Sequence, residues 1–180
     1  MGGYATHALL LAAMLGLAGR GAAEPAPEFL LKDLEGVSHS LAKYPGKVIL
    51  LNFWSTWCAD CKREVPSLVR LHAQRLPNLI ILGIAVNDAE ANVRAFGEQQ
   101  KVAYPLLLDD DGAVVELYEL EFIPTNIIVD ADGEIHDTIV GFGTVAHFEA
   151  SVLNSLYQLI PRAVEPKGKT AVAWAALKTR

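Results

Sequence analysis

Cys58 and Cys61 are the only two cysteines of the 180-residue chain, and two residues separate them. Thiols at this spacing could bind a metal, form a structural disulfide, or exchange with the disulfide of another protein. A closed zinc site takes four ligands, and none of the five histidines lies near the pair in sequence. A structural bridge across so short a gap would close almost no loop and would stabilise little. The spacing favours exchange and leaves a metal-binding module or copper chaperone as the alternative, since thiolates also suit Cu(I).

The segments around the pair predict where it sits in the fold. Residues 47–54 (KVILLNFW) form an almost continuous apolar run, which is typical of a strand buried on both faces of a sheet. Beyond the cysteines, Val65 and Leu68 begin a pattern with helical spacing. Cys58 would then lie at a helix N-terminus, where unpaired N–H groups and partial positive charge stabilise a thiolate. Cys61, one turn further in, would be the resolving thiol.

The rest of the chain alternates between strand and helix patterns. Strands are predicted at 79–86 and 104–112, helices at 89–100, 113–120 and 145–159, a hairpin at 125–142, and a shorter N-terminal hairpin within 24–46. Parallel strands need crossover helices, whereas hairpins add antiparallel strands. We therefore expect an α/β fold with a central mixed β-sheet flanked by helices.

These features resemble the thioredoxin superfamily, and within it the exported TlpA/ResA/CcmG-like thiol-disulfide oxidoreductases. The resemblance covers about residues 26–159 and rests on FWSTWCADC at 53–61, on Glu64 and Pro66, and on Ile123-Pro124-Thr125. It implies a thioredoxin-like fold with an N-terminal hairpin extension and an extra βα insertion. It also implies exchange with disulfide-containing or thiol client proteins, with no bound cofactor.

The resemblance assigns roles to residues outside the pair. Pro124 matches the family's cis-proline and would face the cysteines, and Ile123 would pair with the backbone of a client. An ordinary turn proline is the alternative. Apart from the resemblance, Trp57 would shield the thiolate and offer a flat docking surface, whereas Trp54 is expected to pack in the core. Glu90 resembles an acidic residue proposed to act near the thiols, and its alternative is a solvated carboxylate favoured by the helix dipole.

Two positions depart from the family pattern. Asn52 stands where many thioredoxins have an aspartate, and it cannot take a proton, so the acid–base helper must be Glu90, water or the client. Asp60 stands where a proline is usual in this branch. Its carboxylate would raise the thiol pKa and make the protein a stronger reductant, unless Asp60 only serves the start of the helix. We therefore predict that the protein reduces the disulfides of its clients, and the alternatives are an oxidant or an isomerase.

Both chain ends carry signals of their own. Residues 1–23 read as a secretory signal peptide, because the apolar run HALLLAAMLGLA is too short to span a bilayer comfortably and a small-residue triplet follows it. The segment before that run has no Lys or Arg, so an uncleaved membrane anchor is the alternative. A thioredoxin-like domain would span 24–160. Residues 161–180 hold five basic residues against one acid and predict a flexible basic tail, or else a short helix that contacts a partner or an anionic membrane through Trp174.

Charge and compartment narrow the function. The net charge is −6, and loss of the signal peptide would remove Arg20 and no acid, which argues against nucleic-acid binding. A periplasmic or other extracytoplasmic location permits disulfides. We expect a reductant of client disulfides, such as those of cytochrome c maturation or of copper-site cysteines, supplied with electrons by a membrane donor. A peroxidase is disfavoured, because Leu51 and Ser55 replace the proline and threonine of the peroxiredoxin signature.

Overall fold

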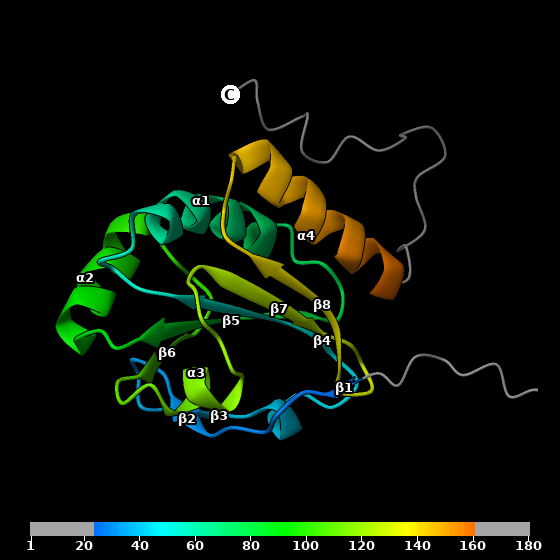
Figure 1. Ribbon diagram of the computed structural model, residues 1–180, viewed down its shortest axis with the longest axis horizontal. Coiled ribbons are helices and arrows are strands. Elements are labelled where there is room, and N and C mark those ends of the chain that lie inside the picture. Colours follow the sequence, from blue (N-terminus) through cyan, green and yellow to red (C-terminus); the bar gives the residue numbers. More distant parts are fainter. Residues whose placement is uncertain (1–23, 161–180) are drawn as a thin grey trace, which may run out of the picture.

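The computed structural model describes residues 24–160, and the predicted signal peptide and basic tail lie outside the described residues. Figure 1 shows a central twisted sheet with helices on both sides. In chain order the elements are β1 (Glu24–Pro25), β2 (Leu31–Lys32), β3 (Ser38–His39), the 3₁₀ helix η1 (Leu41–Lys43), β4 (Val48–Trp54), α1 (Ala59–Ala73), β5 (Leu79–Val86), α2 (Glu90–Gln100), β6 (Leu106–Asp109), α3 (Ala113–Leu117), β7 (Thr125–Val129), β8 (Glu134–Val140) and α4 (Val145–Leu159).

The main sheet is mixed, as predicted. Its strand order is β1-β8-β7-β4-β5-β6. Strands β4, β5 and β6 are parallel, with α1 and α2 as crossover helices, whereas β7, β8 and β1 add antiparallel pairs. In this register Asn52 of β4 lies between Gly83 of β5 and Asn126 of β7. The chain therefore leaves β4 in the interior of the sheet, and the cysteine turn begins there.

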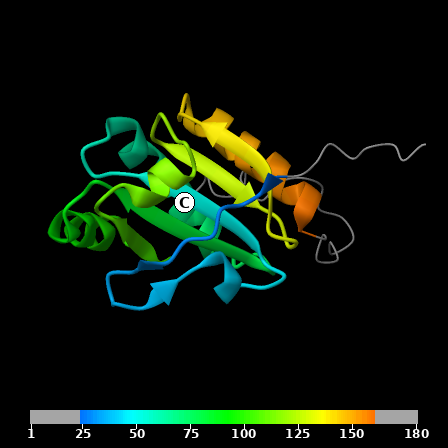
Figure 2. The ribbon, with the colours of Figure 1, turned by 60° about the horizontal axis from the view of Figure 1, so that its bottom comes forward.

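The two faces of the sheet are covered by different elements. Helices α1 and α4 lie on one face, and α3 with the N-terminal segment lies on the other (Figures 1 and 2). The first face packs Leu68, Phe148 and Trp54 into one core, and the second packs Phe53 and Tyr118 into another. Trp54 is 1% exposed, which confirms the expectation of a core residue. None of the helices in residues 24–160 has both the length and the apolar composition that crossing a bilayer requires.

The N-terminal hairpin is present but short. Strands β2 and β3 have two residues each and form a separate antiparallel pair. Asp33 holds the turn, because one oxygen of its carboxylate accepts the N–H groups of Glu35 and Val37 and the other lies 2.8 Å from Nε2 of His39. Strand β1 was not predicted: Glu24 pairs with Ile135 at the edge of the main sheet. A two-residue strand has no periodicity from which sequence could predict it.

Gly83 permits close packing in the middle of the sheet, and we expect Gly83→Ala to destabilise the fold. An added Cβ would lie 2.8 Å from Leu106, 3.1 Å from Tyr104 and 3.3 Å from Trp54. Overpacking of this kind costs about 1–3 kcal/mol of unfolding free energy, measurable by urea denaturation. Gly97→Ala is the comparison variant: its Cβ would also approach Leu106 at 2.8 Å, but only the end of that one side chain, and a helix gains about 1 kcal/mol from the exchange of Gly for Ala. Equal stability of the two variants would contradict the expectation.

Candidate active site

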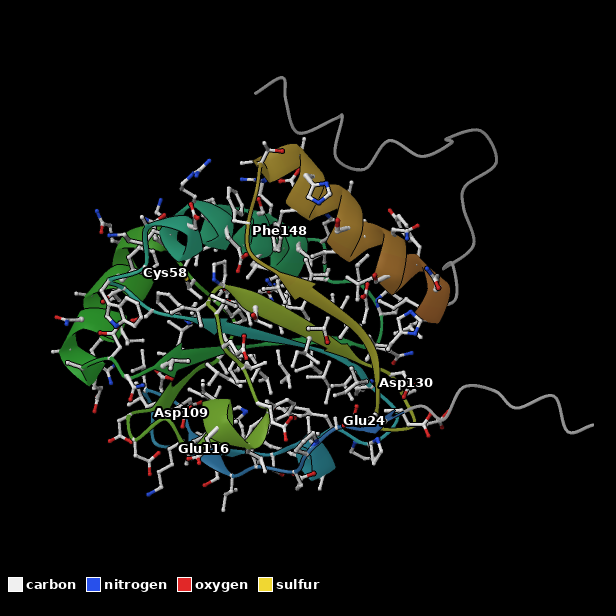
Figure 3. The ribbon with its side chains drawn as sticks, in the orientation of Figure 1. Glu24, Cys58, Asp109, Glu116, Asp130 and Phe148 are labelled. Carbon is white, nitrogen blue, oxygen red and sulfur yellow. A yellow bond between two sulfur atoms is a disulfide. The ribbon has the colours of Figure 1, made fainter. Side chains whose placement is uncertain are left out.

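The two cysteines lie at the start of α1, where Figure 3 labels Cys58. They form a disulfide whose Cα atoms are 5.3 Å apart. Cys58 is the N-cap residue of α1, and its Sγ accepts a hydrogen bond from the N–H of Cys61 at 3.1 Å. Cys58 is 9% exposed and Cys61 is 0% exposed. Cys58 therefore keeps a small accessible fraction at the helix N-terminus, whereas Cys61 is fully covered.

The Ile123–Pro124 segment meets the pair from another part of the chain. The peptide bond between these two residues is cis. The carbonyl oxygen of Ile123 lies 3.8 Å from Sγ of Cys58, although 65 positions separate the residues in sequence. The carbonyl of Pro124 accepts the N–H of Gly141 at 2.8 Å, which ties this segment to the end of β8. The structure thus brings the predicted proline and its neighbour to Sγ of Cys58.

A buried carboxyl group lies one helical turn beyond Cys61. Glu64 is 0% exposed, and its two oxygens accept hydrogen bonds from the side-chain amides of Asn52 at 2.5 Å and Asn126 at 3.2 Å. Burial raises the pKa of Glu64 to about 8, because desolvation of the carboxylate outweighs these two hydrogen bonds. A carboxyl group with this pKa exchanges a proton close to neutral pH.

Glu64 stands in the motif that carries the family resemblance, but no chemical role was predicted for it. A signal was nevertheless present, because Glu64 shares the inner helical face with Cys61, Val65 and Leu68. A carboxyl group on such a face must lose its water when the protein folds. Asn52, which cannot itself take a proton, instead holds the group that can.

Asp88 fixes the turn that leads into the cysteines. Its carboxylate, 8% exposed, accepts hydrogen bonds from the hydroxyl of Ser55 at 2.8 Å and from the N–H of Thr56 at 2.6 Å. Burial alone would raise the pKa of Asp88, but these hydrogen bonds outweigh it and hold the pKa below the usual value. Nothing in the sequence motif indicated this residue, because it follows β5 and reaches the turn only in the folded protein.

Three predicted site residues lie at the surface. The side chain of Trp57 is 62% exposed beside Cys58. The exposed carboxylate of Asp60 pairs with Arg63 at 2.9 Å, and that of Glu90 pairs with Arg94 at 2.9 Å. Each acid is therefore partly neutralised by a cation on its own helix. The roles predicted for these three residues stay predictions.

Few potential metal ligands lie close together in the part of the chain that the structure describes. Within residues 24–160 there is no group of three or more His, Cys, Asp and Glu side chains that could hold a metal ion. His136 lies in β8 and His147 in the first turns of α4. The two thiols, the natural ligands for Cu(I), are bonded to each other.

A cysteine pair that opens the helix after a central strand and faces a cis-proline defines a thioredoxin-like protein with a redox-active disulfide. Comparison of the chain with known proteins agrees with this class. The sequence profile of the AhpC/TSA family matches residues 22–138, and the chain belongs to this family. Its relatives are named for disulfide chemistry, and the chain is a thiol-disulfide oxidoreductase of the ResA/DsbE type, with Cys58 and Cys61 as its pair.

Three known proteins illustrate the likeness. The chain is 36% identical to the thiol-disulfide oxidoreductase ResA of Geobacillus thermodenitrificans over 117 residues, which are 64% of this chain and 67% of that protein. A thiol:disulfide interchange protein of the thioredoxin family from Chlorobium tepidum superposes with a TM-score of 0.66 at 28% identity, over 77% of this chain and 99% of that one. A secreted disulfide oxidoreductase of Mycobacterium tuberculosis, described as homologous to Escherichia coli DsbE, gives a TM-score of 0.62 at 25% identity, over 70% and 95%.

We expect Glu64 to make the stability of the protein fall as the pH rises. Its pKa is about 8 in the folded state and about 4.5 when unfolded, so the folded protein binds the proton more tightly. The stability that the protonated group contributes is complete below pH 4.5 and is lost as the pH rises to about 8. Within that window the slope is at most about 1 kcal/mol per pH unit. Glu64→Gln stays neutral and should flatten it, as measured by urea denaturation across this pH range.

Glu90→Gln is the control for that experiment, because the carboxylate of Glu90 is exposed and already paired with Arg94. It should keep the slope of the wild-type protein. If Glu64→Gln also kept that slope, Glu64 would be ionised throughout the range and could not exchange a proton near neutral pH.

Proposed function

We propose that this protein reduces disulfides of client proteins outside the cytoplasm. The observation that carries the proposal is the asymmetry of the pair: Cys58, at the N-terminus of α1, keeps a small accessible fraction, whereas Cys61 is fully covered. In the reduced protein the Cys58 thiolate attacks one client sulfur, and the other client sulfur leaves as a thiolate. Cys61 then attacks Cys58 in the mixed disulfide, which releases the second client thiolate and forms the disulfide seen in the structure.

The second step requires that Cys61 lose its proton inside the protein. Glu64 is one helical turn away, is buried with it, and has a pKa of about 8, close to that of an ordinary thiol. Proton transfer is most effective when donor and acceptor have similar pKa values. We assign Glu64 as the acceptor of the Cys61 proton, ahead of Glu90, whose exposed carboxylate pairs with Arg94.

The surface around Cys58 offers contacts for the client. Ile123 lies against the reactive sulfur and would pair with client backbone in an extended conformation, with Pro124 fixing its direction. Trp57 presents an exposed aromatic face next to Cys58. Contacts of this kind accept many sequences, since backbone pairing supplies affinity without selecting a side chain.

Two observations support reduction as the direction. The residues between the cysteines are Ala59 and Asp60, without the histidine that would stabilise a thiolate strongly. The carboxylate of Asp60 disfavours a second negative charge on the pair, although Arg63 offsets part of this effect. Cysteines that must be reduced before they receive haem or copper are suitable clients, and a membrane protein that carries reducing power across the bilayer is a suitable electron donor.

The extracytoplasmic location rests on the apolar N-terminal sequence followed by a small-residue triplet. It is supported by the description of the Mycobacterium tuberculosis relative as secreted. Membership of the AhpC/TSA family does not make a peroxidase function more plausible. Ser55 stands at the position of the signature threonine, and its hydroxyl donates to Asp88.

The redox potential of the Cys58–Cys61 pair tests the proposed direction. We expect a value near that of thioredoxin, about −270 mV, when the protein is equilibrated with a dithiothreitol series and the two forms are separated after alkylation. A potential near that of the strong oxidant DsbA, about −120 mV, would instead make the protein an oxidant.

The influence of Asp60 on the thiol can be separated from its place in the first turn of α1. Asp60→Asn removes the charge and should lower the pKa of the Cys58 thiol by about a few tenths of a pH unit, since exposed charges interact weakly. Arg63→Gln removes the neutralising partner and should shift that pKa in the opposite direction. The pH dependence of Cys58 alkylation measures both shifts. Two unchanged profiles would leave Asp60 as a residue of the helix start alone.

A further inference from the structure

An open groove of about 630 Å³ lies beside the active site, on the face of the sheet that α1 and α4 do not cover. Its floor is formed by β7 and β8, and its sides by the segment 117–122 and by β1. Figure 2 shows α3 and β1 on the two sides of this part of the sheet. Three large apolar side chains in the groove are unusually exposed: Leu117 (46%), Phe122 (66%) and Val140 (59%). Exposed apolar side chains that gather in one hollow mark an interaction surface more often than single ones do.

One end of the groove is formed by residues that flank the Ile123–Pro124 segment, which lies against Cys58. Phe122 precedes Ile123, whose carbonyl oxygen lies 3.8 Å from Sγ of Cys58. Val140, on the other side, pairs with Thr125, the residue after Pro124. A client sulfur bonded to Cys58 brings its neighbouring residues within a few ångströms of this point. One arm of the client therefore has a direct path into the groove.

The charge of the groove is of one sign. Glu24, Glu119 and Glu121 line it, and none of the described lining residues is Lys, Arg or His. Apolar side chains below carboxylates fit an occupant that carries both apolar and cationic side chains. Because the carboxylates are exposed, they would act mainly on the rate of association and on partner choice.

The backbone along the groove is also open. Strand β1 pairs only with Ile135 and Glu134 of β8, and no other strand within residues 24–160 pairs with the outer edge of β8 from 136 to 140. An exposed edge of this kind accepts a further strand through main-chain hydrogen bonds. An occupant that enters from Cys58 can therefore lie extended along β8.

We infer that this groove binds the residues next to the reactive cysteine of the client, and that it selects an extended segment with cationic and apolar side chains. The inference rests on the proposed function, since it identifies the chemistry of the clients that reach Cys58. It adds a choice of sequence that backbone pairing at Ile123 does not provide.

The test uses the chain with Cys61→Ser, which stops exchange at the mixed disulfide. The probes are two cysteine peptides activated with a 2-thiopyridyl group, one flanked by Lys and Leu and the other by Glu and Leu. The Cys58 thiolate attacks the peptide sulfur, the peptide–thiopyridyl bond breaks, and 2-thiopyridone leaves with a measurable absorbance. The same reaction with 2,2′-dithiodipyridine gives the reactivity of Cys58 without a peptide, and each peptide rate is divided by it.

At low ionic strength we expect the normalised rate of the Lys peptide to be about tenfold higher than that of the Glu peptide. The difference should shrink in high salt. Glu119→Lys with Glu121→Lys should abolish or reverse it. Phe122→Ser should slow both peptides about fivefold, because apolar contact is lost. Glu35→Lys with Glu98→Lys is the control, since it changes the net charge by the same amount outside the groove, and it should keep the preference.

A preference that survives the double charge reversal would overturn the inference. So would groove variants that speed up both peptides, because another segment of this chain, such as residues 161–180, would then be the occupant. Failure of the proposed function gives a different result: 2,2′-dithiodipyridine itself would react at Cys58 no faster than with free cysteine.

Discussion

The chemistry of this protein depends on one hydrogen bond, from the N–H of Cys61 to Sγ of Cys58. It forms because Cys58 occupies the N-cap of α1, where backbone donors have no partner within the helix. Asp88 accepts hydrogen bonds from Ser55 and Thr56 in the preceding turn, which fixes the position of the N-cap residue relative to the end of β4. The same geometry that favours a thiolate on one sulfur places the other beneath it, which is the asymmetry that directional exchange requires.

The core under the pair is less apolar than stability alone would favour. Glu64, Asn52 and Asn126 form a buried polar cluster between α1 and the central strands, and the desolvation that raises the pKa of Glu64 opposes folding at neutral pH. The cluster is held by strand register, because Asn52 and Asn126 lie directly opposite each other in β4 and β7. A group that weakens the fold is thus kept in a fixed position one helical turn from Cys61, which is understandable if it carries the proton of that thiol.

Much of this arrangement could be predicted from sequence, because its signals are local. The runs at 47–54 and 79–86 have the apolar continuity of buried parallel strands, and both are strands in the structure. The pair was predicted to open a helix, and α1 begins at Ala59. Two features depend on contacts between residues that are distant in the chain: the strand at Glu24–Pro25 and the hydrogen bond from Thr56 to Asp88. No periodicity in the sequence predicts such contacts. The role of Glu64 could have been found by asking which way its helical face points.

Exposed carboxylates lie at two different distances from Cys58. Asp60 lies in the first turn of α1, close enough to influence the thiol pKa, but Arg63 pairs with it and limits the effect. Glu119 and Glu121 line the groove next to Ile123, and by our inference they would influence which client approaches rather than the sulfur itself. A cation of the client that settles near these carboxylates would be held close to Cys58 during the mixed disulfide. If the protein is a reductant as proposed, an acidic surface would suit it in two ways: it would oppose excess thiolate in the free protein, and it would favour cationic clients.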